Sequence, residues 1–149
     1  ARRHGIPVTR LGGGTNVLVS DRGIRGLVVR LGREFDYRRW QEADGEHVPV
    51  EVGAASRLAR FVHEAVDRGL AGVEFAAGIP GTVGGGALMN AGAFGGELGT
   101  VIAGAEAVTL EGECFAGQVS YVARWEFGVR TRAGIEIVIF RHALDDFRE

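Results

Sequence analysis

The chain has 149 residues, 46% of them hydrophobic, and a formal net charge of −2, which is enough material for one domain with a core. No apolar run approaches the roughly 20 residues that cross a bilayer, and the near-neutral balance does not favour nucleic acid as a partner. All 17 basic residues are arginine, which excludes lysine chemistry such as Schiff bases and the Walker A phosphate loop.

The first part of the chain is predicted to hold two short strands around a glycine turn. Gly5 and Pro7 are typical of a helix end, so we expect a helix before the first residue and a chain that begins part-way through a larger structure. Strands are expected at 8–11 and 17–19, on either side of a turn at 12–16. Such a turn can offer backbone N–H groups to a phosphate, and a turn without a ligand is the alternative.

The next stretch is predicted to form a buried strand, an edge strand and a hairpin. The run 27–31 is apolar at nearly every position, which predicts a strand buried on both faces. The stretch 33–41 mixes aromatic with polar residues and predicts an edge strand; the acidic balance disfavours an aromatic platform for nucleic acid. A turn at 43–46 then leads into a returning strand at 48–52.

Residues 56–68 are predicted to form the one clear helix. Ser56 suits its N-cap and Gly69 suits its end. Apolar side chains recur at a spacing of three and four, so one stripe should face the core, at Leu58, Phe61, Val62, Ala65 and Val66. We expect this helix to pack on a sheet.

Residues 78–97 include eight glycines in twenty positions. An ordinary helix or strand does not tolerate this, because each interior glycine costs roughly 0.5–1 kcal/mol relative to alanine. Concave runs of bare N–H groups bind anions, so the segment predicts a phosphate-bearing cofactor, with a close-packed glycine turn as the alternative. Thr82 is expected near the start of a short helical turn that aims free N–H groups at the anion. Asn90 should either clamp the backbone or contact the ligand.

The remaining patterns complete an α+β fold, in which the glycine turn at 12–16 could meet the glycine segment at 78–97. Strands are expected at 101–110 and 135–144, with a turn at 111–113. The turn at 12–16 is not a Rossmann fingerprint, because Val17 replaces the third glycine and a strand is expected next instead of a helix. The single cysteine, Cys114, cannot form an internal disulfide, which fits a reducing compartment.

Two stretches resemble motifs of a known family. Residues 11–21, Leu-Gly-Gly-Gly-Thr-Asn-Val-Leu-Val-Ser-Asp, resemble the first motif of the UDP-N-acetylenolpyruvoylglucosamine reductase family. Residues 69–85, followed by Met-Asn-Ala-Gly-Ala-Phe-Gly-Gly-Glu at 89–97, resemble its second and more specific motif. The motifs occur in the right order around a matching helix. The resemblance covers nearly the whole chain and is firmest over 8–100.

The resemblance implies a cytoplasmic flavoenzyme of bacterial peptidoglycan synthesis. In the family, NADPH reduces a bound FAD, and hydride then passes to the enolpyruvyl double bond of a small-molecule UDP-sugar, giving UDP-N-acetylmuramate. The implied fold is the core of an FAD-binding type 2 (PCMH, vanillyl-alcohol-oxidase-like) domain. No nucleic acid or membrane partner is implied, and the oligomeric state stays open.

The resemblance also implies a set of site residues. The FAD contacts would be Gly12, Gly13, Gly14, Thr15, Asn16, Val17, Ile79, Pro80, Gly81, Thr82, Gly84, Gly85, Asn90, Gly92, Ala93, Phe94 and Gly95. Arg130 ends a segment that resembles the family's Phe-Gly-Tyr-Arg, whose arginine stabilises a developing enolate oxygen. Val129 and Arg132 depart from the family's tyrosine and serine, so a surface or salt-bridged arginine is the alternative.

We expect residues 1–149 to be an FAD-binding domain, truncated at both ends, that does not turn over alone. The family's proton donor, a serine or cysteine, and its partner glutamate lie in a later substrate-binding domain. Two alternatives stay open: the FAD-binding core of another oxidase with the same superfold, and a structural relic that has lost the flavin.

Overall fold

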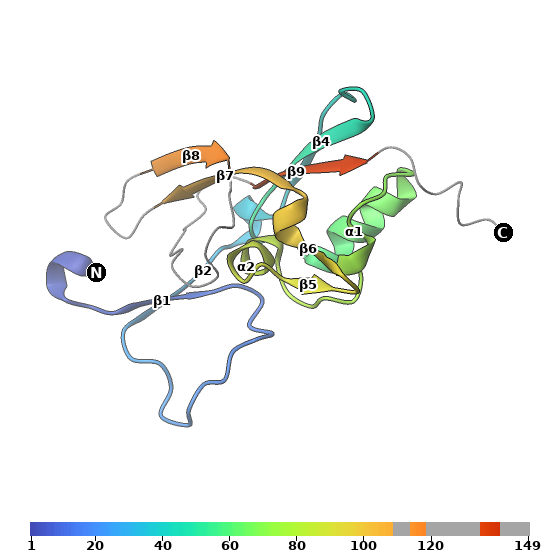
Figure 1. Ribbon diagram of the computed structural model, residues 1–149. Coiled ribbons are helices and arrows are strands. Elements are labelled where there is room, and N and C mark those ends of the chain that lie inside the picture. The colour runs from blue at the N-terminus through green and yellow to red at the C-terminus, as the bar shows by residue number, and fades with distance from the viewer. Residues whose placement is uncertain (109–113, 119–134, 141–149) are drawn as a thin grey trace.

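The computed structural model describes residues 1–108, 114–118 and 135–140. It combines a five-stranded sheet, one longer helix, a parallel strand pair and a small hairpin (Figure 1). The predicted α+β class is therefore confirmed. None of the helices in this described part has the length and apolar character needed to span a bilayer.

The five-stranded sheet is antiparallel throughout, in the order β3-β4-β9-β7-β8. The predicted edge strand and hairpin are confirmed, because β3 lies at the edge and pairs with β4, with Arg38 opposite Val52. The predicted turn at 111–113 lies outside the described residues, as do 141–144, the last residues of the strand expected at 135–144. The strands are β3 (Arg38–Trp40), β4 (His47–Val52), β7 (Ile102–Val108), β8 (Cys114–Gln118) and β9 (Ile135–Phe140).

Helix α1 (Leu58–Asp67) packs on the sheet as predicted. Its core stripe is buried at four of the five predicted positions, and Trp40 of β3 stacks on Phe61 with ring centroids 6.0 Å apart. Val66 is the exception: it is 40% exposed, at the margin of the stripe. Gly69 adopts φ +70° and closes the helix as predicted.

Ser56 is not the N-cap of α1. The N-cap is Arg57, whose side chain makes no capping hydrogen bond. The Ser56 hydroxyl is fully buried and donates instead to the Tyr37 carbonyl, 3.1 Å away. The capping prediction is therefore wrong: the hydroxyl lies one residue before the N-cap, where it donates to Tyr37 and its oxygen accepts from the Arg38 guanidinium at 3.3 Å.

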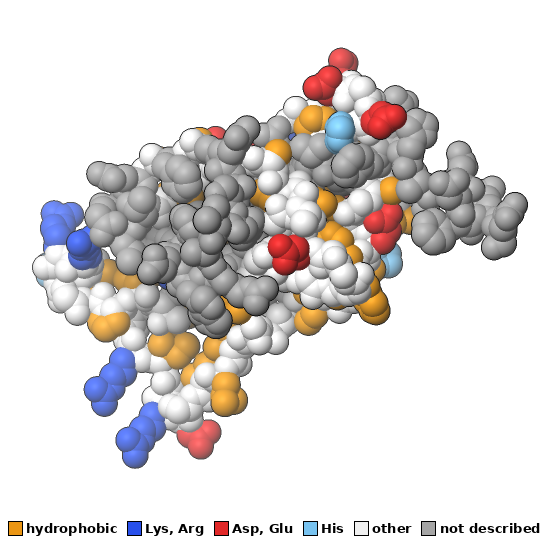
Figure 2. Space-filling model, in the orientation of Figure 1, with side chains coloured by type: hydrophobic (Ala, Val, Ile, Leu, Met, Phe, Trp, Pro, Cys, Tyr) orange, Lys and Arg blue, Asp and Glu red, His pale blue; other side chains and the backbone are white. Residues whose placement is uncertain are grey.

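Strands β1 (Val8–Leu11) and β2 (Leu27–Arg30) form a separate parallel pair, with Val8 opposite Leu27. Both strands were predicted, but burial of the second on both faces is wrong, because all four residues of β2 are exposed. Residues 17–19 form no strand, and Leu18 is fully exposed. The physical reason is the absence of a covering layer among the described residues, and Figure 2 shows apolar side chains on this surface.

The glycine segment folds into a short helix and a hairpin, and in the view of Figure 1 α2 lies between β2 and this hairpin. Helix α2 spans Val83–Leu88, with Thr82 as its N-cap. Strands β5 (Gly92–Ala93) and β6 (Gly96–Glu97) form the hairpin. Four 3-10 helices complete the described structure: Arg2–His4, Arg33–Phe35, Glu74–Ala76 and Leu98–Thr100.

Candidate functional site

The glycine turn at 12–16 meets a second turn at 80–82, although more than sixty residues separate the two glycine turns in the sequence. A Cβ on Gly13 would lie 2.7 Å from the Gly81 Cα, and a Cβ on Gly12 would lie 3.1 Å from the Thr82 Oγ1. The Thr15 hydroxyl donates to the Pro80 carbonyl at 3.2 Å. Glycine is required at Gly13 because the neighbouring atom is backbone and cannot rotate away.

The first turn of α2 offers no free N–H group. The N–H of Val83 donates to the Ser56 carbonyl at 2.8 Å, and that of Gly84 to the Ala54 carbonyl at 2.9 Å. The N–H of Gly85 donates to the Thr82 hydroxyl at 3.2 Å, which makes Thr82 a side-chain N-cap. The predicted short helix is confirmed, but its predicted role as the donor of free N–H groups is wrong.

Unused N–H groups lie instead in the turns themselves. Within the described residues, no backbone N–H from Gly12 to Val17 donates a hydrogen bond, and neither do those of Gly81 and Thr82. Successive free N–H groups in a turn form an anion-binding concavity without any cationic side chain. Because the residues of both turns are uncharged, the backbone is their means of attracting an anion. This arrangement fits a diphosphate.

Two glycines of the segment, Gly84 and Gly86, are required by close packing. A Cβ on Gly84 would lie 2.7 Å from the Ala54 Cβ, and a Cβ on Gly86 would lie 2.7 Å from the Leu98 Cδ1. By contrast, a Cβ on Gly14 or Gly78 would meet open space. The glycine content therefore has two causes: close packing of α2, and an open backbone at the turns.

Asn90 acts as a clamp on the backbone. Its Oδ1 accepts a hydrogen bond from the Gly99 N–H at 2.8 Å, and its own backbone has φ +45°. This supports the first of its two expected roles. Nearby, Phe94 occupies the tip of the β5–β6 hairpin with φ +52° and a side chain that is 93% exposed.

One predicted residue is not placed by the structure, and one segment that supports the site was not predicted. Arg130 lies outside the described residues, so the structure does not place it. The segment 54–58, which holds α2 in place, was missed by sequence reasoning. Its hydrogen bonds to 81–84 join distant parts of the chain, and no local pattern signals them.

Tyr37 is the one described group with a clearly shifted pKa. Burial, together with its hydrogen bond to Glu51 at 2.8 Å, raises the pKa of Tyr37 to about 12. The guanidinium of Arg39 lies 4.5 Å from the centre of the Tyr37 ring. None of these residues belongs to the glycine turns, so the phenol is a structural group.

Three comparisons with known proteins agree. The FAD binding domain family matches residues 1–116. The chain is 52% identical over 102 residues to UDP-N-acetylenolpyruvoylglucosamine reductase of Rubrobacter xylanophilus, covering 68% of this chain and 33% of the relative. It is 46% identical over 133 residues to UDP-N-acetylenolpyruvoylglucosamine reductase 2 of Symbiobacterium thermophilum. This match covers 89% of this chain and 40% of the relative.

A solved structure has the same fold. The crystal structure of UDP-N-acetylenolpyruvylglucosamine reductase from Thermus caldophilus aligns with a TM-score of 0.66 and 30% sequence identity, over 93% of this chain and 49% of that chain. The chain thus spans well under two thirds of these relatives. The match over residues 1–116, together with the meeting glycine turns, shows that the chain belongs to the FAD-binding domain family.

Proposed function

We propose that this chain is the FAD-binding segment of an NADPH-dependent UDP-N-acetylenolpyruvoylglucosamine reductase. The observation that carries the proposal is the meeting of two uncharged glycine turns whose N–H groups donate to no acceptor among the described residues. Both turns lie within residues 1–116, which match the FAD binding domain family, and the chain is 52% and 46% identical to two proteins with this reductase name. The proposed setting is the cytoplasm, and the proposed substrate is a small UDP-sugar.

In this proposal the turns hold the diphosphate of the FAD. The N–H groups of 12–17 and of Gly81 and Thr82 donate to its oxygens, while the Thr15 side chain ties the first turn to Pro80. When bound, the flavin would supply hydride transfer from NADPH to the enolpyruvyl double bond. The proposed contacts are the seventeen residues given above, with two roles refined: Gly84 packs α2 and Asn90 clamps the hairpin.

The catalytic part of the proposal concerns Arg130 and the rest of the enzyme. Arg130 would stabilise negative charge that develops on the substrate, as a nearby cation does in a site shielded from water. Residues 1–149 would form one FAD-binding domain, and the proton donor would come from a separate substrate-binding domain. The chain spans 33% and 40% of the length of these two relatives.

A chimera tests the proposed activity. The 102 aligned residues of the Rubrobacter xylanophilus reductase would be replaced by those of this chain. We expect the chimera to bind FAD and to oxidise NADPH only when the enolpyruvyl UDP-sugar is present. A flavin-bound but inactive chimera would indicate the core of another FAD enzyme. A folded chimera without flavin would indicate a structural relic.

A further inference from the structure

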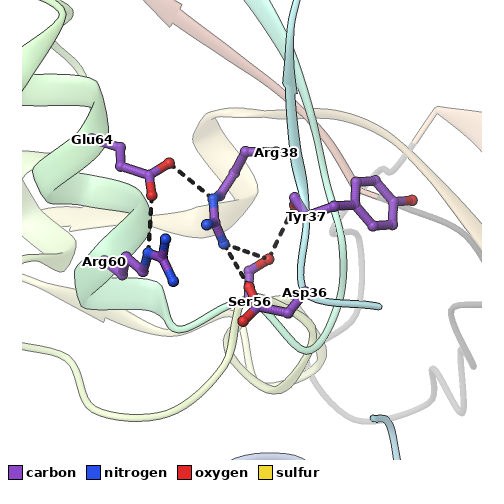
Figure 3. Close-up of polar contacts among 6 residues, drawn as sticks. All are labelled: Asp36, Tyr37, Arg38, Ser56, Arg60 and Glu64. Carbon is purple, nitrogen blue, oxygen red and sulfur yellow. Dashed lines mark hydrogen bonds and ion pairs between the residues drawn. The ribbon is translucent and has the colours of Figure 1, made fainter. Parts of the chain in front are cut away.

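Arg38 is a nearly buried cation that the candidate site does not include. Its side chain is 9% exposed. Figure 3 shows its guanidinium between two carboxylates and a hydroxyl: Nε donates to the Glu64 Oε2 at 2.9 Å, and Nη1 donates to the Asp36 Oδ1 at 2.6 Å and to the Ser56 Oγ at 3.3 Å. A charge this enclosed is tolerated because each of its partners is an acceptor.

Ser56 connects this cluster to the glycine segment. Its hydroxyl donates to the Tyr37 carbonyl, which fixes it to the start of β3, and its own carbonyl accepts from the Val83 N–H at 2.8 Å. On either side, the Gly84 N–H donates to the Ala54 carbonyl at 2.9 Å, and the Leu58 N–H donates to the Gly81 carbonyl at 3.1 Å. Residues 54–58 and 81–84 thus form one hydrogen-bonded strip.

This strip sets the gap between the two glycine turns. Gly81 is bound to the strip through its carbonyl, and its Cα lies against Gly13 with no room for a Cβ between them. A shift of the strip therefore moves the free N–H groups of Gly81 and Thr82 relative to those of the first turn. A ligand that is held by several hydrogen-bond donors binds less tightly when the spacing of those donors changes.

We propose that Arg38 and Ser56 are positioning residues for the cofactor site. They touch no part of it, and they act by holding 54–58 in place so that 81–84 meets the first turn at the spacing that a diphosphate needs. The inference rests on the proposed FAD-binding function. It assigns a role to an ion cluster around a nearly buried arginine that would otherwise only join β3 to α1.

The test compares Arg38→Met with Arg39→Met in the full chain. Arg39 is the next residue on β3, its side chain is 67% exposed, and it pairs with Glu51, so its replacement removes the same charge without touching the cluster. Two quantities are measured: hydrogen exchange at the Val83 and Gly84 amides without FAD, and FAD affinity by flavin fluorescence. Ser56→Ala is the second variant, in case Arg38→Met does not fold.

We expect Arg38→Met to speed exchange at both amides, to weaken FAD binding about tenfold and to alter the visible flavin band. Ser56→Ala should act in the same direction, and Arg39→Met should change neither quantity. A lower melting temperature with unchanged amide exchange and FAD affinity would overturn the inference and leave FAD binding intact. A wild-type chain that binds no FAD would overturn the proposed function, and with it the inference.

Discussion

Phe94 is held in a backbone conformation that suits glycine or asparagine. Its φ of +52° is followed by +85° at Gly95, so both central residues of the hairpin turn are left-handed. Turns of this kind prefer Asn-Gly, because a bulky side chain in this region is strained by roughly 1–2 kcal/mol. Phe94 also buries almost nothing. Strain of this kind, without packing to offset it, is found mainly at ligand sites.

Replacing Phe94 by asparagine should therefore stabilise the fold. We expect Phe94→Asn to raise the free energy of unfolding by about 1 kcal/mol, because no buried contact is lost. Phe94→Ala is the matched control, since it removes the ring but keeps an unfavourable residue at positive φ. Chemical denaturation measures both. Equal stability of the two variants would contradict the strain argument.

Tyr37 makes stability depend on pH in the alkaline range. Its pKa is raised to about 12 in the folded chain, above about 10 in the unfolded chain. The folded state therefore holds the phenol proton more tightly, so the contribution is complete below pH 10 and is lost as the pH rises to 12. We expect the fall in stability between pH 10 and 12 to be shallower in Tyr37→Phe, measured by urea denaturation. Identical slopes would show that the phenol proton is not linked to folding.

At the scale of elements, helix α1 is attached to the rest of the fold by the buried apolar side chains on one of its faces. Phe61 is fully buried and stacks on Trp40, whereas Val66 is 40% exposed. We expect Phe61→Ala to cost about 3–5 kcal/mol of unfolding free energy, because it leaves a cavity. Val66→Ala should stay within about 0.5 kcal/mol. Denaturant midpoints test the contrast, and similar losses at both positions would contradict this view of the helix face.

Elements were predictable where local chemistry decides them. The period of α1, its end at Gly69 and the hairpin before β4 all follow from neighbouring residues, and the structure confirms them. Ser56 was wrongly predicted to be the N-cap of α1 because its actual hydrogen-bond partner, the Tyr37 carbonyl, is distant in the sequence. The N–H groups in the first turn of α2 were wrongly predicted to be free for the same reason, since the carbonyls of Ala54 and Ser56 accept from them. Residues 17–19 are β-branched or apolar, but no described strand pairs with them.

At the scale of the molecule, the site joins two differently built parts. The antiparallel sheet and α1 form the hydrophobic core, and the parallel β1–β2 pair carries the first glycine turn outside it (Figure 1). The meeting of the turns was predicted only as a possibility, because contact between distant segments depends on the whole fold. The structure supplies the contact, through Gly13 against Gly81 and Thr15 against Pro80.

The central claim is that the meeting turns hold FAD, and flavin retention tests it most directly. The chain would be incubated with FAD and desalted, and its visible absorbance would be measured beside that of Gly13→Ala and Gly32→Ala. A Cβ on Gly13 meets the Gly81 backbone at 2.7 Å, whereas a Cβ on Gly32 meets nothing within 4 Å. We predict near-stoichiometric flavin in the wild type and in Gly32→Ala, and little in Gly13→Ala. A colourless wild type, or full retention by Gly13→Ala, would contradict the account.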